Sequence, residues 1–128
     1  MDASRRILLV DDEAAILFAF SQFLGAPGIT IDTAETVDKA VGFITANDYC
    51  AAVVDLRLTG ATTMEGCDII RLIKERRPST AIVVVTAYGG EEIRETVVRL
   101  GADFYFEKPV SPKVIRETLK NRGVYTFT

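Results

Sequence analysis

The chain has 128 residues, of which 48% are hydrophobic and 26% are charged, and its net charge is -3. This length and composition are typical of one globular domain, and the slightly acidic balance without a basic stripe argues against direct binding to nucleic acid or to an anionic membrane. No apolar run approaches the roughly 20 residues of a membrane span, and the start lacks the pattern of a signal peptide. We therefore expect a cytoplasmic protein.

Five short apolar runs alternate with five segments of helical periodicity. The runs predicted to be strands are residues 6–10, 29–33, 51–54, 81–85 and 104–106. The predicted helices are residues 14–24, 37–47 with Thr36 as cap, a segment between Gly66 and Pro78, 91–100, and a segment from Pro112 to Gly123 with Ser111 as cap. The apolar stripes that should face the sheet include Phe23, Val41, Val98 and Val114.

Regular alternation of strands and helices predicts an α/β fold, a doubly wound five-stranded parallel sheet with helices on both faces and right-handed crossovers. The flavodoxin-like strand order 2-1-3-4-5 is the expected one, with residues 29–33 at the edge because one of their faces is more polar. No repeat, linker or low-complexity segment interrupts the pattern. We therefore predict a single domain over residues 1–128, with a core of about 5–122 and a tail over 124–128.

The chain contains no histidine and two cysteines, Cys50 and Cys67. Without an imidazole it can have no Ser-His triad, no histidine general base and no phosphohistidine of its own. The two cysteines have neither metal-ligand nor redox spacing. We expect two free thiols, buried or half buried.

Polar side chains follow four of the predicted strands. They are Asp11, Asp12 and Glu13 after the first strand, Asp55 after the third, Thr86 after the fourth, and Glu107 and Lys108 after the fifth. Because parallel strands end at the same edge of a sheet, and the first strand lies beside the third, Asp11, Asp12 and Asp55 should share one pocket. Taken singly, these acids could be helix caps and Lys108 a solvated lysine.

Three neighbouring carboxylates repel one another unless a cation lies between them. Mg²⁺, or Mn²⁺, prefers oxygen ligands and fits such a group. With a bound metal, Asp55 could act as a nucleophile towards phosphorus, while Lys108 and Thr86 contact the oxygens of the phosphoryl group. Glu13 would contribute through water.

Asp11-Asp12, Asp55, Thr86-Ala87 and Lys108-Pro109, in this order at strand ends, resemble the receiver domain of two-component response regulators over essentially the whole chain. The resemblance implies that a histidine kinase phosphorylates Asp55, and that Asp11, Asp12, Asp55 and the backbone carbonyl of Arg57 hold Mg²⁺. It also implies that Lys108 contacts the phosphoryl group and precedes a cis peptide bond. A downstream output domain or target protein would receive the signal.

The resemblance also implies a conformational switch. Thr86 would turn towards the phosphate and Tyr105 would move into the vacated space, altering the surface of helix 91–100, strand 104–106 and the last helix, through which a homodimer could form. Tyr105 could instead simply pack against the last helix. Arg57 and Tyr88, two residues beyond the acceptor and the switch threonine, are expected to modulate the lifetime of the acyl phosphate. The loop 56–65 departs from the family, since it is about three residues longer and has Thr59-Gly60 in place of a proline.

Three other functions fit the sequence less well. A haloacid-dehalogenase phosphatase needs a second acid two residues after its nucleophile, where this chain has Arg57. A nucleotide-binding module needs a glycine-rich pattern after the first strand, which is absent. A receiver-like scaffold regulated without phosphorylation is the main alternative, although the acceptor, the lysine and the metal acids are all present. We expect no enzyme activity beyond self-phosphorylation from phosphodonors and slow autodephosphorylation.

Overall fold

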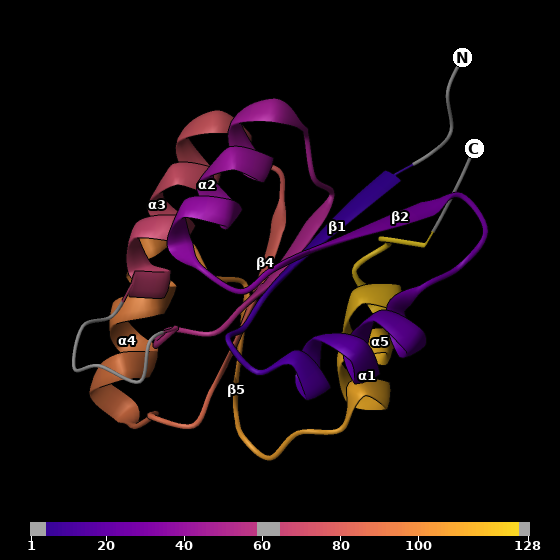
Figure 1. Cartoon of the computed structure of the whole chain (residues 1–128). Coiled ribbons are helices and arrows are strands. Elements are labelled where there is room, and N and C mark those ends of the chain that lie inside the picture. The colour runs from indigo at the N-terminus through magenta and orange to yellow at the C-terminus, as the bar shows by residue number, and fades with distance from the viewer. Residues whose placement is uncertain (1–4, 59–64, 126–128) are drawn as a thin grey trace.

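A computed structural model describes residues 5–58 and 65–125. Along these residues ten elements alternate (Figure 1): β1 (Arg5–Val10), α1 (Ala14–Leu24), β2 (Ile29–Ala34), α2 (Val37–Ala46), β3 (Ala51–Val54), α3 (Glu65–Arg76), β4 (Ala81–Thr86), α4 (Glu91–Leu100), β5 (Phe104–Glu107) and α5 (Pro112–Asn121). The predicted elements are confirmed, with ends that differ by a residue or two. Thr36 caps α2 by accepting a hydrogen bond from the backbone N–H of Lys39, and Ser111 caps α5 in the same way.

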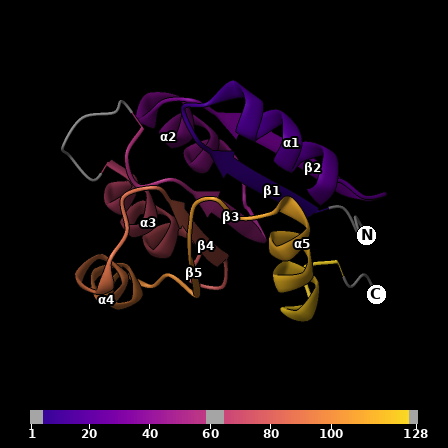
Figure 2. The same cartoon turned by 90° about the horizontal axis from the view of Figure 1, so that it is seen from below.

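The strands form one parallel sheet in the order β2-β1-β3-β4-β5, as predicted. Helices α2, α3 and α4 cover one face of the sheet, and α1 and α5 cover the other (Figures 1 and 2). Strand β2 lies at an edge, as its more polar face indicated. Within the described residues, no helix is long and apolar enough to cross a bilayer.

Alternate residues of the inner strands supply two hydrophobic cores, one on each face. Leu8 of β1 and Val84 of β4 pack under α2, α3 and α4, whereas Leu9 and Val83 pack under α1 and α5. Strand side chains point to opposite faces in turn, so a strand buried on both sides needs apolar residues throughout. Every residue of β4 is accordingly buried. Cys50, half buried, and Cys67, buried, are free thiols, as expected.

Four apolar residues predicted to face the sheet are instead exposed over about a third to a half of their surface, so that part of the prediction was wrong. Their exposed fractions are 47% for Phe23, 36% for Val41, 53% for Val98 and 43% for Val114. Each lies at the flank of its helix's apolar stripe, where the sheet no longer covers it. Val97, one position before Val98 and about 100° around the helix, is fully buried.

The first residues of the predicted tail pack against the domain. Val124 is buried, and the Tyr125 hydroxyl donates a hydrogen bond to the carbonyl of Leu24 at 2.8 Å. The Arg116 guanidinium lies 4.5 Å from the centre of the Tyr125 ring and donates to the carbonyl of Phe23 at 2.6 Å. Burial raises the pKa of Tyr125 to about 12. These contacts tie the end of α1 to α5.

Asp103 fastens the turn between α4 and β5 to β4, to α3 and to the residue that follows α5. Its carboxylate accepts a hydrogen bond from the backbone N–H of Ile82 in β4 at 2.8 Å. It also forms ion pairs with Lys74 of α3 at 3.9 Å and with Arg122 after α5 at 3.4 Å. Gly101 ends α4 with a φ of 116°, a conformation that favours glycine. The C-terminal end of α4 is therefore held in place.

Candidate functional site

The carboxyl ends of β1, β3, β4 and β5 carry the polar residues of the site. Asp11 and Asp55 follow β1 and β3 directly and are each 5% exposed, and Thr86, the last residue of β4, is fully buried. Carboxylate oxygens of Asp11, Asp12 and Asp55 lie within 4.8 Å of one another. The structure thus brings together the three acids that the sequence placed in one pocket.

Lys108, directly after β5, bridges two of these acids. Its Nζ lies 2.9 Å from Oδ2 of Asp11 and 3.2 Å from Oδ2 of Asp55, with Oε2 of Glu13 farther away at 3.9 Å. One ammonium among Asp11, Asp12 and Asp55 leaves two negative charges uncompensated when all are ionised. The cluster therefore has room, electrostatically, for a further cation.

Burial and charge act in opposite directions on the ionisation of this cluster. Burial raises the pKa of Asp55, and the neighbouring charge of Asp11 raises it further, while Lys108 opposes both. Burial by itself would lower the pKa of Lys108, but hydrogen bonds and charges from Asp11 and Asp55 outweigh it, so that the pKa lies above its usual value. Lys108 is consequently charged at neutral pH.

The loops after β1, β3 and β4 begin with the same local contact. Asp11 and Asp55 each accept a hydrogen bond, at 2.9 and 3.4 Å, from the backbone N–H two residues further along. The Thr86 hydroxyl likewise accepts a hydrogen bond from the backbone N–H of Tyr88 at 3.1 Å. Short side chains with an oxygen acceptor favour such turns, which explains why these residue types can end a buried strand.

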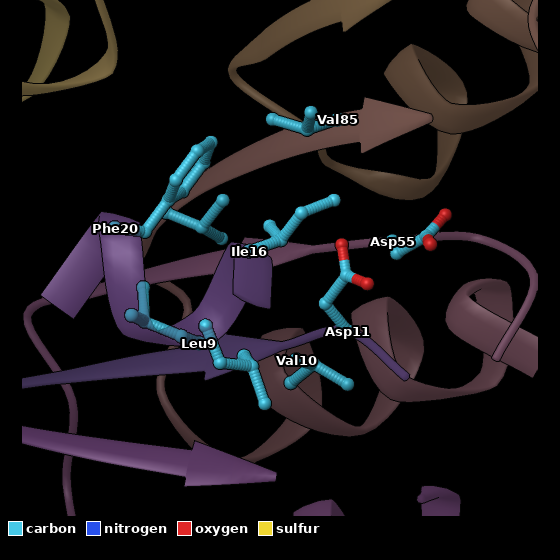
Figure 3. A pocket seen from close by; sticks show the side chains of 9 residues that line it. Leu9, Val10, Asp11, Ile16, Phe20, Asp55 and Val85 are labelled. Atoms are coloured by element: carbon cyan, nitrogen blue, oxygen red, sulfur yellow. The ribbon is translucent and has the colours of Figure 1, made fainter. Parts of the chain in front are cut away.

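An apolar wall from α1 and β4 adjoins the acids. Figure 3 shows Asp11 and Asp55 near each other, with Ile16 beside Asp11 and with Phe20 and Val85 farther away, and all five residues line a small pocket. The wall excludes water from one side of the carboxylates, which accounts for the effect of burial on Asp55.

Arg57 and Tyr88 stack on each other across the neighbouring loops. The guanidinium carbon of Arg57 lies 4.2 Å from the centre of the Tyr88 ring, a cation–π geometry. Nε of Arg57 is buried and has no hydrogen-bond partner among the described residues. The sequence analysis places both residues near Asp55, the predicted acceptor, but gives no indication that they contact each other.

Gly66 was missed as a site residue. A Cβ there would come within 2.5 Å of the Asp55 carbonyl oxygen and 2.7 Å of Cα of Leu56, so only glycine lets α3 begin against the backbone of Asp55 and Leu56. The backbone N–H of Gly66 donates to the Leu56 carbonyl at 2.9 Å. The glycine after a long loop was the only signal in the sequence. Thr59 and Gly60, which the sequence analysis names as a difference between this loop and the family, lie outside the described residues.

Tyr105 faces α4, so the alternative that it packs against α5 was wrong. It packs against the core under α2, α3 and α4, whereas Phe104 and Phe106, its neighbours in β5, pack on the α1 and α5 side. The peptide bond between Lys108 and Pro109 is cis, as the resemblance implied.

A family model described as "Response regulator receiver domain" matches residues 7–120. The chain is a receiver domain of the two-component response regulator family. Among curated relatives, the photosynthetic apparatus regulatory protein RegA of Cereibacter sphaeroides is 32% identical over 123 residues, covering 96% of this chain and 65% of RegA. A cyclic di-GMP phosphodiesterase of Thermotoga maritima is 35% identical over 125 residues, covering 94% of this chain and 33% of the relative. The receiver domain thus spans less than two thirds of the length of these relatives.

Solved receiver structures share the fold over nearly the whole domain. The crystal structure of a CheY-like response regulator receiver domain protein from Methanospirillum hungatei JF-1 has a TM-score of 0.83 and 31% identity, covering 93% of each chain. The solution structure of the beryllofluoride-activated NtrC4 receiver domain dimer has a TM-score of 0.79 and 30% identity, covering 91% of this chain and 93% of that one.

Proposed function

We propose that this receiver domain accepts a phosphoryl group on Asp55 from a histidine kinase and transmits the signal through a change in its surface. The observation that supports this most directly is the surroundings of Asp55. Its carboxylate is almost buried, lies 3.2 Å from the Lys108 ammonium, and shares a 4.8 Å cluster with Asp11 and Asp12.

The donor set of the cluster fits Mg²⁺ or Mn²⁺. Three carboxylates with two uncompensated negative charges are hard oxygen ligands of the kind these ions prefer. Asp11, Asp12, Asp55 and the backbone carbonyl of Arg57 would hold the ion. When bound, it would neutralise charge on the phosphoryl oxygens and lower the repulsion met by the incoming phosphate.

The side chains of the chain itself account for the remaining steps. A carboxylate oxygen of Asp55 attacks phosphorus, the new O–P bond forms as the bond to the donor's imidazole nitrogen breaks, and that nitrogen recovers its proton from solvent. Lys108 exchanges its contact with Asp55 for one with a phosphoryl oxygen. Glu13, 3.9 Å from Lys108, would act through water.

Thr86 and Tyr105 are the proposed switch pair. The phosphoryl group, which carries about 1.5–2 negative charges, replaces the single charge of the Asp55 carboxylate beside a buried hydroxyl that can turn to bond it. Movement of the Thr86 side chain would free space for the Tyr105 ring and shift the α4-β5-α5 surface.

Arg57 and Tyr88 are the proposed modulators of the acyl phosphate. Their stacked side chains bridge the loops after β3 and β4, where an attacking water would approach Asp55. In Arg57→Ala and Tyr88→Ala, we expect the phosphoryl group to hydrolyse several-fold faster, measured as loss of the phosphorylated mass after the donor is removed. Arg71→Ala, on the exposed side of α3, is the control. Unchanged hydrolysis in both variants would contradict the role.

The partners follow from the same proposal. A histidine kinase would supply the phosphoryl group, and an output domain or a target protein would receive the signal. The beryllofluoride-activated NtrC4 receiver domain is a dimer. For this chain we include a homodimer through α4-β5-α5 in the proposal.

Intact mass tests the acceptor and the metal together. After incubation with acetyl phosphate and Mg²⁺, the wild type should gain one phosphoryl group, whereas Asp55→Asn, or the wild type in EDTA, should gain none. Asp48→Asn, which changes an exposed carboxylate, should behave like the wild type. If the wild-type mass stays unmodified and beryllofluoride with Mg²⁺ leaves the amide NMR spectrum unchanged, the chain is instead a receiver-like scaffold regulated without phosphorylation.

A further inference from the structure

The hydroxyl of Tyr105 joins β5 to the loop between β4 and α4. It donates a hydrogen bond to Oε2 of Glu107 at 3.0 Å and accepts one from the backbone N–H of Gly90 at 3.0 Å. We call these two hydrogen bonds the hydroxyl bridge. A phenol has one proton, so its donation to Glu107 directs the oxygen lone pairs towards the loop. The carboxylate therefore orients the group that holds Gly90.

Gly89 shows how closely the loop fits the hydroxyl bridge. A Cβ on Gly89 would overlap the Tyr105 hydroxyl and would lie 2.6 and 2.7 Å from Oε2 and Cγ of Glu107. Gly89 is not one of the glycines with positive φ. Space, and not backbone conformation, is what requires glycine at this position while the bridge is formed.

The loop held by the bridge is the one that begins at Thr86. The Thr86 hydroxyl accepts a hydrogen bond from the backbone N–H of Tyr88, and its carbonyl accepts one from the backbone N–H of Lys108 at 2.8 Å. The bridge thus fixes the far end of a five-residue segment, 86–90, whose near end lies at the phosphorylation site. A contact made in only one of two arrangements shifts the equilibrium towards that arrangement.

We propose that Glu107 is a positioning residue that, through the Tyr105 hydroxyl, holds loop 86–90 in the unphosphorylated arrangement and so sets how readily the receiver domain switches. This inference rests on the proposed function, because the arrangement being opposed is the phosphorylated one. The bridge lies at the surface, so its contribution is that of an ordinary hydrogen bond. Removing it should favour the active arrangement by about two- to tenfold.

The test measures the affinity for beryllofluoride with Mg²⁺, followed by amide NMR. Glu107→Ala and Gly89→Ala should each bind about two- to tenfold more tightly than the wild type, the first by removing the acceptor and the second by crowding the bridge. Glu107→Gln keeps an acceptor oxygen and should lie close to the wild type. Glu75→Ala, which removes an exposed carboxylate from α3, should bind like the wild type.

A double-mutant cycle separates the bridge from a simple effect of charge. In the Tyr105→Phe background, Glu107→Ala should cause no further change in affinity, because the hydroxyl is already missing. If Glu107→Ala tightens binding equally with Tyr or Phe at position 105, lost negative charge explains the effect and the proposal fails. Unchanged or weaker binding in Glu107→Ala and Gly89→Ala also overturns it.

Amide hydrogen exchange distinguishes failure of this inference from failure of the proposed function. In the ligand-free protein, Gly90 should exchange faster in Glu107→Ala and in Tyr105→Phe than in the wild type. If the wild type does not bind beryllofluoride, the proposed function fails, while faster exchange of Gly90 still supports the bridge as a restraint on the loop. Equal exchange in all three proteins overturns the bridge.

Discussion

Helices α3 and α4 lie side by side on the same face of the sheet but are held in different ways (Figures 1 and 2). Helix α3 buries five residues: Gly66, Cys67, Ile69, Ile70 and Ile73. Among the ten residues of α4, all described, only Val97 is buried, and half of the helix is charged: Glu91, Glu92, Arg94, Glu95 and Arg99. Displacement of α4 would therefore expose less apolar surface than displacement of α3, so α4 is the helix of this pair whose movement costs less free energy.

The largest difference should appear when a central side chain of each helix is truncated. Ile70 and Val97 are both fully buried. Ile70→Ala should lower the free energy of unfolding by about 2–5 kcal/mol. Val97→Ala removes fewer carbons, from a helix that has fewer buried residues, and should lower the free energy of unfolding by about 1.5 kcal/mol. Urea unfolding measures both. Equal losses would show that α4 is packed as firmly as α3.

The C-terminal end of α4 should be more sensitive to a glycine-to-alanine change than a helix position with open space around it. In Gly101→Ala, a side chain is forced into a φ of 116° and against the stem of Lys74. We expect a loss of about 1–2 kcal/mol in the free energy of unfolding, from the backbone conformation. Gly42→Ala, in α2, has open space around the new methyl group and is the matched control. If both changes are neutral, the end of α4 is not held as described.

Asp55, against whose backbone α3 begins, should oppose folding. Its pKa is raised in the folded state by burial, so the ionised group costs stability above that pKa, and this cost disappears as the pH falls towards the pKa of the unfolded chain. In EDTA at neutral pH, Asp55→Asn should therefore be modestly more stable than the wild type. The advantage should shrink on acidification towards about pH 4, where Asp is half protonated in an unfolded chain. Urea unfolding across this range provides the measurement, and an advantage independent of pH would contradict it.

The smallest effect should come from the exposed side of α3. Arg71 and Asp68 form an ion pair at 2.9 Å, with side chains 55% and 75% exposed. Solvent screens such a pair, so Arg71→Ala should change the free energy of unfolding by less than about 0.5 kcal/mol. A larger loss would show that the firmness of α3 comes from its surface as well as from its buried residues.

The sequence predicted what depends on short segments. Apolar runs fixed the strands, and acids, a hydroxyl and a lysine at their ends predicted that Asp11, Asp12, Asp55 and Lys108 would meet at one edge, because parallel strands leave no other arrangement. Patterns in short segments do not predict a contact between two side chains that belong to different loops.

The stacking of Arg57 on Tyr88 is one contact of that kind, and the hydroxyl bridge of Tyr105 is another. Helical periodicity likewise could not show where the sheet stops covering a stripe, which is why Phe23 and Val98 were assigned to the core. The packing of Tyr125 against α1 depends on a pairing across the whole chain, and a short tail carries no local pattern that predicts it.

The two ends of α4 are held unequally, so the helix can tilt about its C-terminal end. Asp103 and Gly101 hold its C-terminal end, whereas its N-terminal end starts at Gly90, which provides no side-chain cap and is restrained by the Tyr105 hydroxyl. Ten residues of α-helix span about 15 Å. A tilt of about 10° around the held end would move the other end of the helix by about 3 Å, a change in the surface that a binding partner can detect.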